Sequence, residues 1–273
     1  MLVYVDDLLV LSHQPEITMK LSEEFYRLKD GYAKPDRYLG AQIKEWRFPE
    51  NASEVHWAMS SEQYIKEAIK NVEAHPQKHN RGLPKVHQPL PAHYHTELDI
   101  TAPPADDDIN IYQSYVSILR WIFELGCLDI YVHVALMSSY LTNPRIGHLE
   151  AIYYIFGYLK THNRSTIVFD SSYVKWQESD FMHFDWTDFY GDTKEHIPQN
   201  APPPRGMPVQ INAFVDANHA GNKLNRRSHS GILIYLNRSP TMWYSKAQKT
   251  VETSTFGSEL VALRIATKLI KGL

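Results

Sequence analysis

Proline interrupts this chain at three places and so limits where regular structure can run. Residues 83–91 and 101–108 are rich in proline, and residues 198–208 contain the run Ala201-Pro202-Pro203-Pro204. Proline has no backbone N–H and a fixed φ, so it is excluded from helix interiors and central strands. The third stretch is typical of a linker, and we expect a domain boundary near residue 205.

The sign of the charge changes at the same boundary. The formal net charge of the 273 residues is −3, but residues 201–273 contain ten Lys and Arg against three Asp and Glu. Their net charge of +7 leaves −10 for residues 1–200. Such an asymmetry is typical of a module that faces nucleic acid, although a solvated basic face would give the same count.

Composition excludes several classes of protein. Hydrophobic residues make up 43% of the chain and aromatic residues 12%, enough to bury a core. The only cysteine, Cys127, lies in an apolar stretch, which favours a reducing compartment and an inert thiol. Charged residues and His133 interrupt the most apolar segment, residues 118–140, and the N-terminus lacks the basic region of a signal peptide. We therefore expect a protein that is neither secreted nor bound to a membrane.

Hydrophobic periodicity predicts a mixed, α+β organisation. Helical spacing covers residues 17–29, 62–72 and 111–161, the last broken at Asn143-Pro144-Arg145, and a strand pair is expected at 38–43 and 54–59. Beyond the linker, strands are predicted at residues 209–216, 231–236 and 241–245, followed by an amphipathic helix over 252–272.

Two acidic constellations point to metal-dependent chemistry. Tyr4-Val5-Asp6-Asp7 lies between two apolar runs and predicts a β-hairpin with two adjacent carboxylates. Like charges repel, and a pair of divalent cations of the kind used in phosphoryl transfer would neutralise them; an ordinary acidic turn is the alternative. Farther along, Asp216 ends a predicted strand and Glu259 lies on the following helix, where the two could share one cation.

The residues around these carboxylates resemble a known family. Tyr4 to Asp7 resemble the catalytic hairpin of reverse transcriptases, and the C-terminal region resembles the ribonuclease H of copia-type retrotransposons. Four blocks carry the second resemblance, at residues 216–221, 226–231, 243–246 and 253–259. Residues 38–40, 112–116, 119–121, 138–141, 144 and 148–151 are similar to further blocks of copia-type polymerases.

The resemblance implies an architecture. Residues 1–60 would be a C-terminal piece of the polymerase palm, and residues 61–197 a mostly helical thumb and connection. Residues 198–208 would form the linker and residues 209–273 a truncated ribonuclease H-like domain. Such a protein would act in the cytoplasm, within a virus-like particle, or in the nucleus.

The resemblance also implies roles for single residues. Asp6 and Asp7 would bind Mg²⁺ or Mn²⁺ for polymerisation, with Tyr4 and Val5 against the primer–template. Asp216 and Glu259 would bind the same kind of ion for cleavage of the RNA strand of an RNA–DNA hybrid. The basic residues that would contact phosphates are Arg226, Arg227, Lys246 and Lys249, for which solvated surface is the alternative.

Relatives use further carboxylates at both sites, which this chain does not supply, and Asn218 stands where many relatives have Asp. We therefore expect weak metal binding, no activity from this chain alone, and dependence on the missing polymerase segments as partners. Two other hypotheses remain: a non-catalytic nucleic-acid-binding remnant, and an inert fold that does not accumulate.

Other residues have simpler interpretations. His75, His79, His87, His93 and His95 lack the partners and spacing of a structural zinc site. Trp243 and Tyr244 are expected in the core or on a sheet face. Ser228 and Ser230 are interpreted as turn residues.

Overall fold

The computed structural model describes residues 2–4, 7–28, 31–74, 82–180, 184–193, 196–203 and 206–273, with the side chains of residues 2–4 and 7 excepted. The first part contains the hairpin β1 (Leu2–Tyr4) and β2 (Asp7–Leu9), then helix α1 (Pro15–Phe25). β3 (Arg37–Tyr38), β4 (Ala41–Phe48) and β5 (Asn51–Ser60) follow. Helix α2 (Glu62–Glu73) comes next, close to its predicted bounds.

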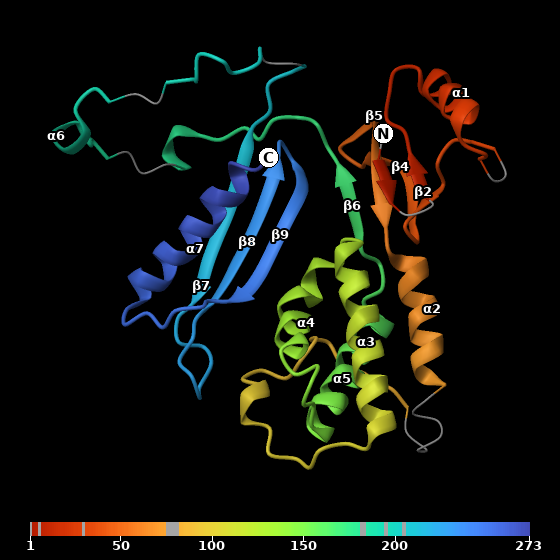
Figure 1. Ribbon diagram of the computed structural model, residues 1–273, viewed down its shortest axis with the longest axis vertical. Coiled ribbons are helices and arrows are strands. Elements are labelled where there is room, and N and C mark those ends of the chain that lie inside the picture. Colours follow the sequence, from red (N-terminus) through yellow and green to blue (C-terminus); the bar gives the residue numbers. More distant parts are fainter. Residues whose placement is uncertain are drawn as a thin grey trace.

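The helical part of the chain is inserted between two neighbouring strands. It comprises α2, the 3₁₀ turn η2 (Thr96–Leu98), α3 (Asp106–Glu124), the turn η3 (Leu128–Ile130), α4 (Tyr131–Ser138) and α5 (Ile146–Thr161). The chain then returns as β6 (Thr166–Phe169), which pairs antiparallel with β5 in a sheet ordered β3-β4-β5-β6. Figure 1 shows α2 to α5 gathered at one end of this sheet.

Two predictions about the helical part were wrong. Residues 106–108 were expected to lie outside any helix, yet their three aspartates form the first turn of α3, where carboxylates favour the helix N-terminus. The expected helix from residue 111 ends at Glu124, because Gly126 has a φ of +102°. A Cβ at Gly126 would overlap the Ile167 side chain of β6, so this turn lets α3 approach the sheet closely.

The helices enclose a common core, which we call the helical core. Its fully buried side chains are Ile65, Val72, Tyr112, Val116, Leu119, Ile122, Cys127, Ile130, Val134, Met137, Ile152, Ile155, Phe156 and Leu159. Tyr112 satisfies its hydroxyl there by donating to the Met137 carbonyl at 2.7 Å. Burial raises the pKa of the Tyr112 hydroxyl, so it remains a donor at neutral pH.

Before the C-terminal sheet the chain runs through η4 (Glu178–Asp180) and the short helix α6 (Thr187–Tyr190). The sheet consists of β7 (Ile211–Asn218), β8 (His229–Leu236) and β9 (Ser239–Ala247) in that order, all antiparallel. Helix α7 (Thr255–Ile270) covers one face, as Figure 1 shows. Ile232 and Ile234 of β8 are buried against Ala266 of α7. The β-then-α order beyond the linker was therefore predicted correctly.

Side chains join the C-terminal sheet to the rest of the molecule. Trp243 of β9 packs against the helical core, as expected of a core aromatic, whereas Tyr244 packs against the core under α7. The Arg238 guanidinium lies 3.1 Å from Asp170, just beyond β6. Ser239 Oγ donates to the Asp170 carbonyl at 2.9 Å. Asp170 is 3% exposed, so its carboxylate depends on Arg238 and on the Ser172 N–H and hydroxyl.

Replacing Asp170 with Asn should lower the free energy of unfolding by about 2 kcal/mol at neutral pH, as expected for a lost charge-assisted hydrogen bond. Burial raises the pKa of Asp170, but bonds from Ser172 and the charges of Arg238 and His56 hold it below its ordinary value. Such a group stabilises the fold above the unfolded-state pKa of about 4 and loses that contribution as the pH falls through the lower folded-state pKa.

Urea unfolding of the parent chain and of Asp170→Asn at a series of pH values measures this difference, with Asp188→Asn on exposed α6 as the control. If the difference in the free energy of unfolding between the parent chain and Asp170→Asn did not decrease toward acid pH, the role assigned to the ionised carboxylate would be contradicted.

Candidate functional site

Strand register brings the predicted C-terminal residues to one end of the sheet. Asp216 of β7 pairs with Gly231 of β8, which pairs with Ser245 of β9. The next residues along these strands are the loop 219–228 and the segment that contains Lys246 and Lys249. Residues far apart in the sequence therefore share one rim, which we call the acidic–basic rim.

Helix α7 adds Glu259 to this rim. The helix begins after Ser254, whose hydroxyl accepts a hydrogen bond from the Gly257 N–H at 3.1 Å and caps the first turn. Glu259 then lies in the second turn, and its Oε1 accepts a hydrogen bond from the Ala217 N–H at 3.3 Å. Because Ala217 follows Asp216 directly, this bond holds the Glu259 carboxylate at the backbone next to Asp216. Asp216 is exposed and Glu259 is half-buried.

A buried polar network supports the rim. Gln248 is 3% exposed, and its Nε2 donates to Ser230 Oγ at 2.9 Å and to the Ser258 carbonyl at 2.8 Å. Its backbone N–H donates to the Ser228 carbonyl at 2.8 Å, and Ser228 Oγ accepts from the Ala220 N–H at 3.0 Å. The network therefore connects the loop after β7, the start of β8, the end of β9 and the first turn of α7.

This network corrects one interpretation and adds residues that the sequence did not reveal. Ser230 was interpreted as a turn residue, but it lies within β8 and is fully buried. Gln248 lies two residues after a matched block and Ser258 lies within one, but nothing in the sequence indicated the buried contact between them. His229 also lies here, with Nε2 2.7 Å from Ser245 Oγ, and burial lowers its pKa. Lowering the pKa of a histidine favours its neutral form.

The four predicted phosphate-contacting residues lie on the same rim. Arg226 and Arg227 are in the loop between β7 and β8, Lys246 is near the end of β9, and Lys249 follows it; all four are exposed. Lys223, which was not among the predicted residues, is exposed in the same loop. Five exposed cations therefore lie at the same end of the sheet as Asp216 and Glu259, which suits a ligand that carries both phosphates and a divalent cation.

The carboxylate pair fits a hard cation in donor chemistry. Mg²⁺ prefers oxygen ligands, keeps several waters, and is commonly held by one or two carboxylates plus phosphate oxygens. Across the described ranges, no group of three or more His, Cys, Asp or Glu side chains could hold a metal ion. Asp216 and Glu259 alone would therefore bind such an ion weakly.

The N-terminal hairpin is described only in part. β1 and β2 pair antiparallel with Tyr4 opposite Asp7, as the pattern predicts. Val5 and Asp6 lie outside the described residues, as do the side chains of Tyr4 and Asp7. The roles predicted for these four residues stay predictions.

Two matched blocks of the polymerase-like region contact each other. Trp121 Nε1 of α3 donates to the Leu39 carbonyl at 3.1 Å. Leu39 and Gly40 have φ values of +53° and +88°, and a Cβ at Gly40 would lie 3.3 Å from the Tyr64 ring. The Tyr38-Leu39-Gly40 block is thus a tight turn held against α2 and α3.

The block at residues 148–151 begins with a buried histidine. His148 is 1% exposed, its Nδ1 accepts from the Arg145 N–H at 3.1 Å, and its Nε2 lies 2.9 Å from the Thr96 carbonyl. Its ring also packs against Tyr140, with 4.2 Å between ring centroids. Through these contacts the buried His148 side chain connects α5 to η2 and stabilises their packing.

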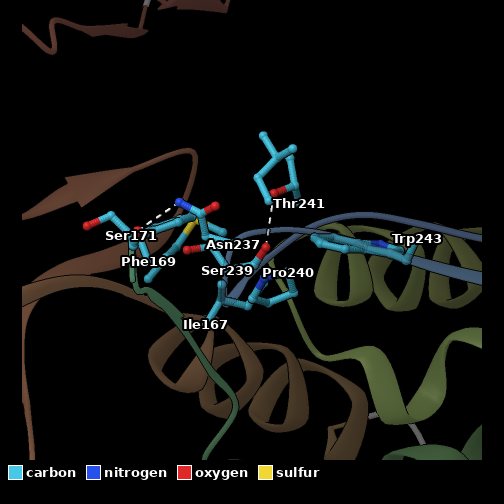
Figure 2. A pocket seen from close by; sticks show the side chains of 10 residues that line it. Ile167, Phe169, Ser171, Asn237, Ser239, Pro240, Thr241 and Trp243 are labelled. Atoms are coloured by element: carbon cyan, nitrogen blue, oxygen red, sulfur yellow. Dashed lines mark hydrogen bonds between the residues drawn. The ribbon is translucent and has the colours of Figure 1, made fainter. Parts of the chain in front are cut away.

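A cavity of about 440 Å³ lies at the junction of the two sheets. Figure 2 shows its lining, which is mainly apolar and comes from β5, β6, β8 and β9, with Asn237 Nδ2 donating to the Ser171 carbonyl at 2.7 Å. Its lining residues are Met59, Ile167, Phe169, Ser171, Leu236, Asn237, Ser239, Pro240, Thr241 and Trp243. With no titratable side chain among them, this cavity does not supply acid–base or metal chemistry.

The remaining predictions about cysteine, histidine and membranes have these outcomes. Cys127 is buried, and burial together with the nearby Asp129 carboxylate raises the pKa of its thiol, as expected of an inert group. His95 lies 3.2 Å from Glu97, whereas His75 and His79 fall outside the described residues. No helix in the described part of the chain has the length and apolar character needed to span a bilayer.

Comparison with known proteins relates the chain to retrotransposon polyproteins. It is 26% identical over 252 residues to a transposon Ty5-1 protein of Saccharomyces cerevisiae, covering 91% of this chain and 66% of that protein. It is 24% identical over 269 residues to the retrovirus-related Pol polyprotein from transposon TNT 1-94 of Nicotiana tabacum, covering 96% of this chain and 17% of that protein. No family model and no solved structure matches. The chain is thus similar to retrotransposon proteins over more than nine tenths of its length.

Replacing Gln248 with Ala should lower the free energy of unfolding by about 2 kcal/mol, because two buried acceptors lose their donor and a void forms under the rim. Thermal and urea unfolding measure the change, and Lys249→Ala on the neighbouring exposed residue is the matched control. Equal stability of the two variants would contradict the structural role assigned to the network.

Proposed function

We propose that this chain is the polymerase and ribonuclease H region of a copia-type retroelement polyprotein, and that its acidic–basic rim binds RNA–DNA hybrid. The observation that carries the proposal is the hydrogen bond from the Ala217 N–H to Glu259, which holds the Glu259 carboxylate at the strand end that bears Asp216. The relation to two retrotransposon proteins supports the same assignment.

The cations and the carboxylates of the rim have different proposed roles. Lys223, Arg226, Arg227, Lys246 and Lys249 would contact backbone phosphates, a sequence-independent interaction that releases counterions. Asp216 and Glu259 would hold Mg²⁺, which when bound lowers the pKa of its water and neutralises charge on the scissile phosphate. The Ala217 N–H restrains the Glu259 carboxylate at the end of β7.

The N-terminal hairpin is proposed to serve the second activity of the same region. Asp6 and Asp7 would bind metal for nucleotide addition, with Tyr4 and Val5 against the primer–template. Their adjacency at a hairpin turn is the only support in this chain, so this proposal rests on sequence and on the backbone pairing of β1 with β2. Primer extension on a primed RNA template, compared with Asp6→Asn/Asp7→Asn, tests it.

A second candidate is a non-catalytic binder of nucleic acid. The observation that favours it is the size of the acidic cluster: the described part of the chain gathers two carboxylates at the rim and no third metal ligand. In this case the cations would bind hybrid and the carboxylates would not support turnover.

Binding of a labelled RNA–DNA hybrid should weaken by about two orders of magnitude between about 50 and 200 mM salt if four of the five cations each neutralise a phosphate. Fluorescence anisotropy at several salt concentrations measures the slope. The double variant Arg226→Ala/Arg227→Ala should reduce the slope of the logarithm of the binding constant against the logarithm of salt concentration by about two. Arg164→Ala/Arg47→Ala, with the same change in charge away from the rim, is the control.

Cleavage separates the two candidates. Mg²⁺-dependent hydrolysis of the RNA strand that Asp216→Asn and Glu259→Gln each abolish would establish the enzyme. Salt-dependent binding without hydrolysis would favour the non-catalytic binder. Absence of binding at low salt would contradict both.

A further inference from the structure

The loop between β7 and β8 is organised by one asparagine. Asn222 Oδ1 accepts hydrogen bonds from the N–H groups of Leu224 at 3.1 Å and Asn225 at 2.9 Å, and the Asn222 carbonyl accepts from the Arg226 N–H at 2.9 Å. Arg226 closes this turn with a φ of +58°. The loop is therefore built to present three exposed cations, Lys223, Arg226 and Arg227.

A carboxylate from the helical part of the chain reaches this loop. Glu97 Oε1 accepts a hydrogen bond from the Lys223 backbone N–H at 2.8 Å, across 126 residues of sequence. In Figure 1 the loop extends beyond the end of the C-terminal sheet, toward the side of the molecule where the helices lie. The Glu97 side chain is only 8% exposed, and the same oxygen lies 3.2 Å from His95 Nδ1.

Glu97 is itself held in place by the helical core. Its neighbour Thr96 is 3% exposed and offers its carbonyl to His148 Nε2 at 2.9 Å. His148 belongs to α5 and is buried against Tyr140. A continuous series of contacts thus runs from α5 through η2 to Lys223 and the basic loop.

The carboxylate has two opposing effects on phosphate binding. Its negative charge at the backbone of the basic loop repels a polyanion and weakens binding. Its hydrogen bond restrains the loop before the ligand arrives. The loop therefore loses less conformational entropy on binding, and phosphate binding is stronger. Burial raises the pKa of Glu97, but the bond from Lys223 and the neighbouring His95 hold it below its ordinary value, so the ionised acceptor persists at neutral pH.

We propose that Glu97 is a positioning residue for nucleic-acid binding, which fixes the basic loop of the C-terminal sheet through the Lys223 N–H. This inference rests on the proposed function, because it assigns Glu97 to the hybrid-binding rim. It makes the helical part of the chain a contributor to that rim without any contact between Glu97 and the nucleic acid.

Two substitutions of Glu97 separate restraint from charge. Glu97→Ala removes both the acceptor and the charge, whereas Glu97→Gln removes the charge and keeps an amide oxygen for the Lys223 N–H. Positioning predicts that Glu97→Ala weakens hybrid binding about fivefold, with a shallower salt slope, while Glu97→Gln binds as tightly as the parent chain or more tightly. A purely electrostatic role predicts tighter binding for both variants.

Glu50→Ala is the matched control, because it makes the same change in net charge in the exposed turn between β4 and β5. Thermal unfolding of each variant shows whether the fold is intact. In a chain that already carries Lys223→Ala, Arg226→Ala and Arg227→Ala, the further change Glu97→Ala should have no effect on binding, because the restrained cations are gone.

Amide hydrogen exchange tests the restraint without nucleic acid. The Lys223 N–H should exchange more than tenfold faster in Glu97→Ala and at the parent rate in Glu97→Gln. Unchanged exchange in Glu97→Ala, or hybrid binding equal to that of Glu50→Ala, would overturn the proposal. Failure of the parent chain to bind hybrid, with faster exchange in Glu97→Ala, would instead contradict the proposed function and leave Glu97 as a purely structural clamp, overturning its assignment to binding.

Discussion

The packing of Trp243 against the helical core fixes where the C-terminal sheet lies, and the other contacts between the two parts depend on it. Trp243 is in the middle of β9, and this strand contacts both α4 and β6. Arg238 then reaches the buried Asp170, and the loop beyond β7 reaches Glu97. An apolar contact of this kind sets position without setting orientation, whereas the two polar contacts, at opposite ends of the sheet, prevent rotation about it.

The acidic–basic rim combines exposed cations with two carboxylates at one end of the C-terminal sheet. Cations alone would attract any polyanion, and a carboxylate pair alone would attract any divalent cation. Their combination favours a phosphate chain that carries its own metal ion, since each partner relieves the repulsion that the other would meet. The buried amide of Gln248 supports this arrangement from beneath without adding charge to it.

The sequence predicted those parts of the structure that local pattern determines. The hairpin pairing of Tyr4 with Asp7, helix α2 and the three C-terminal strands followed from periodicity and turn chemistry. Strand β6 was missed, since four residues after a long helix give almost no periodic signal. In α7 the buried face uses the small residues Ala262 and Ala266 while Leu260 and Leu263 are about half exposed, which side-chain hydrophobicity alone does not predict. The Glu97–Lys223 contact was equally invisible, because 126 residues separate its partners and it uses a backbone N–H that leaves no trace in the sequence.

The matched blocks differ in what they contribute. Trp121 and Leu39 contact each other, and His148 packs on Tyr140 and bonds Thr96, so these blocks hold the fold together. Asp216 is exposed and Arg226 projects from a loop, so they contribute little to packing and are open to a ligand. A relation at 24–26% identity can be sustained by structural joints alone. The proposed function is therefore tested at the exposed carboxylates and cations, where a substitution leaves the packing contacts of the fold intact.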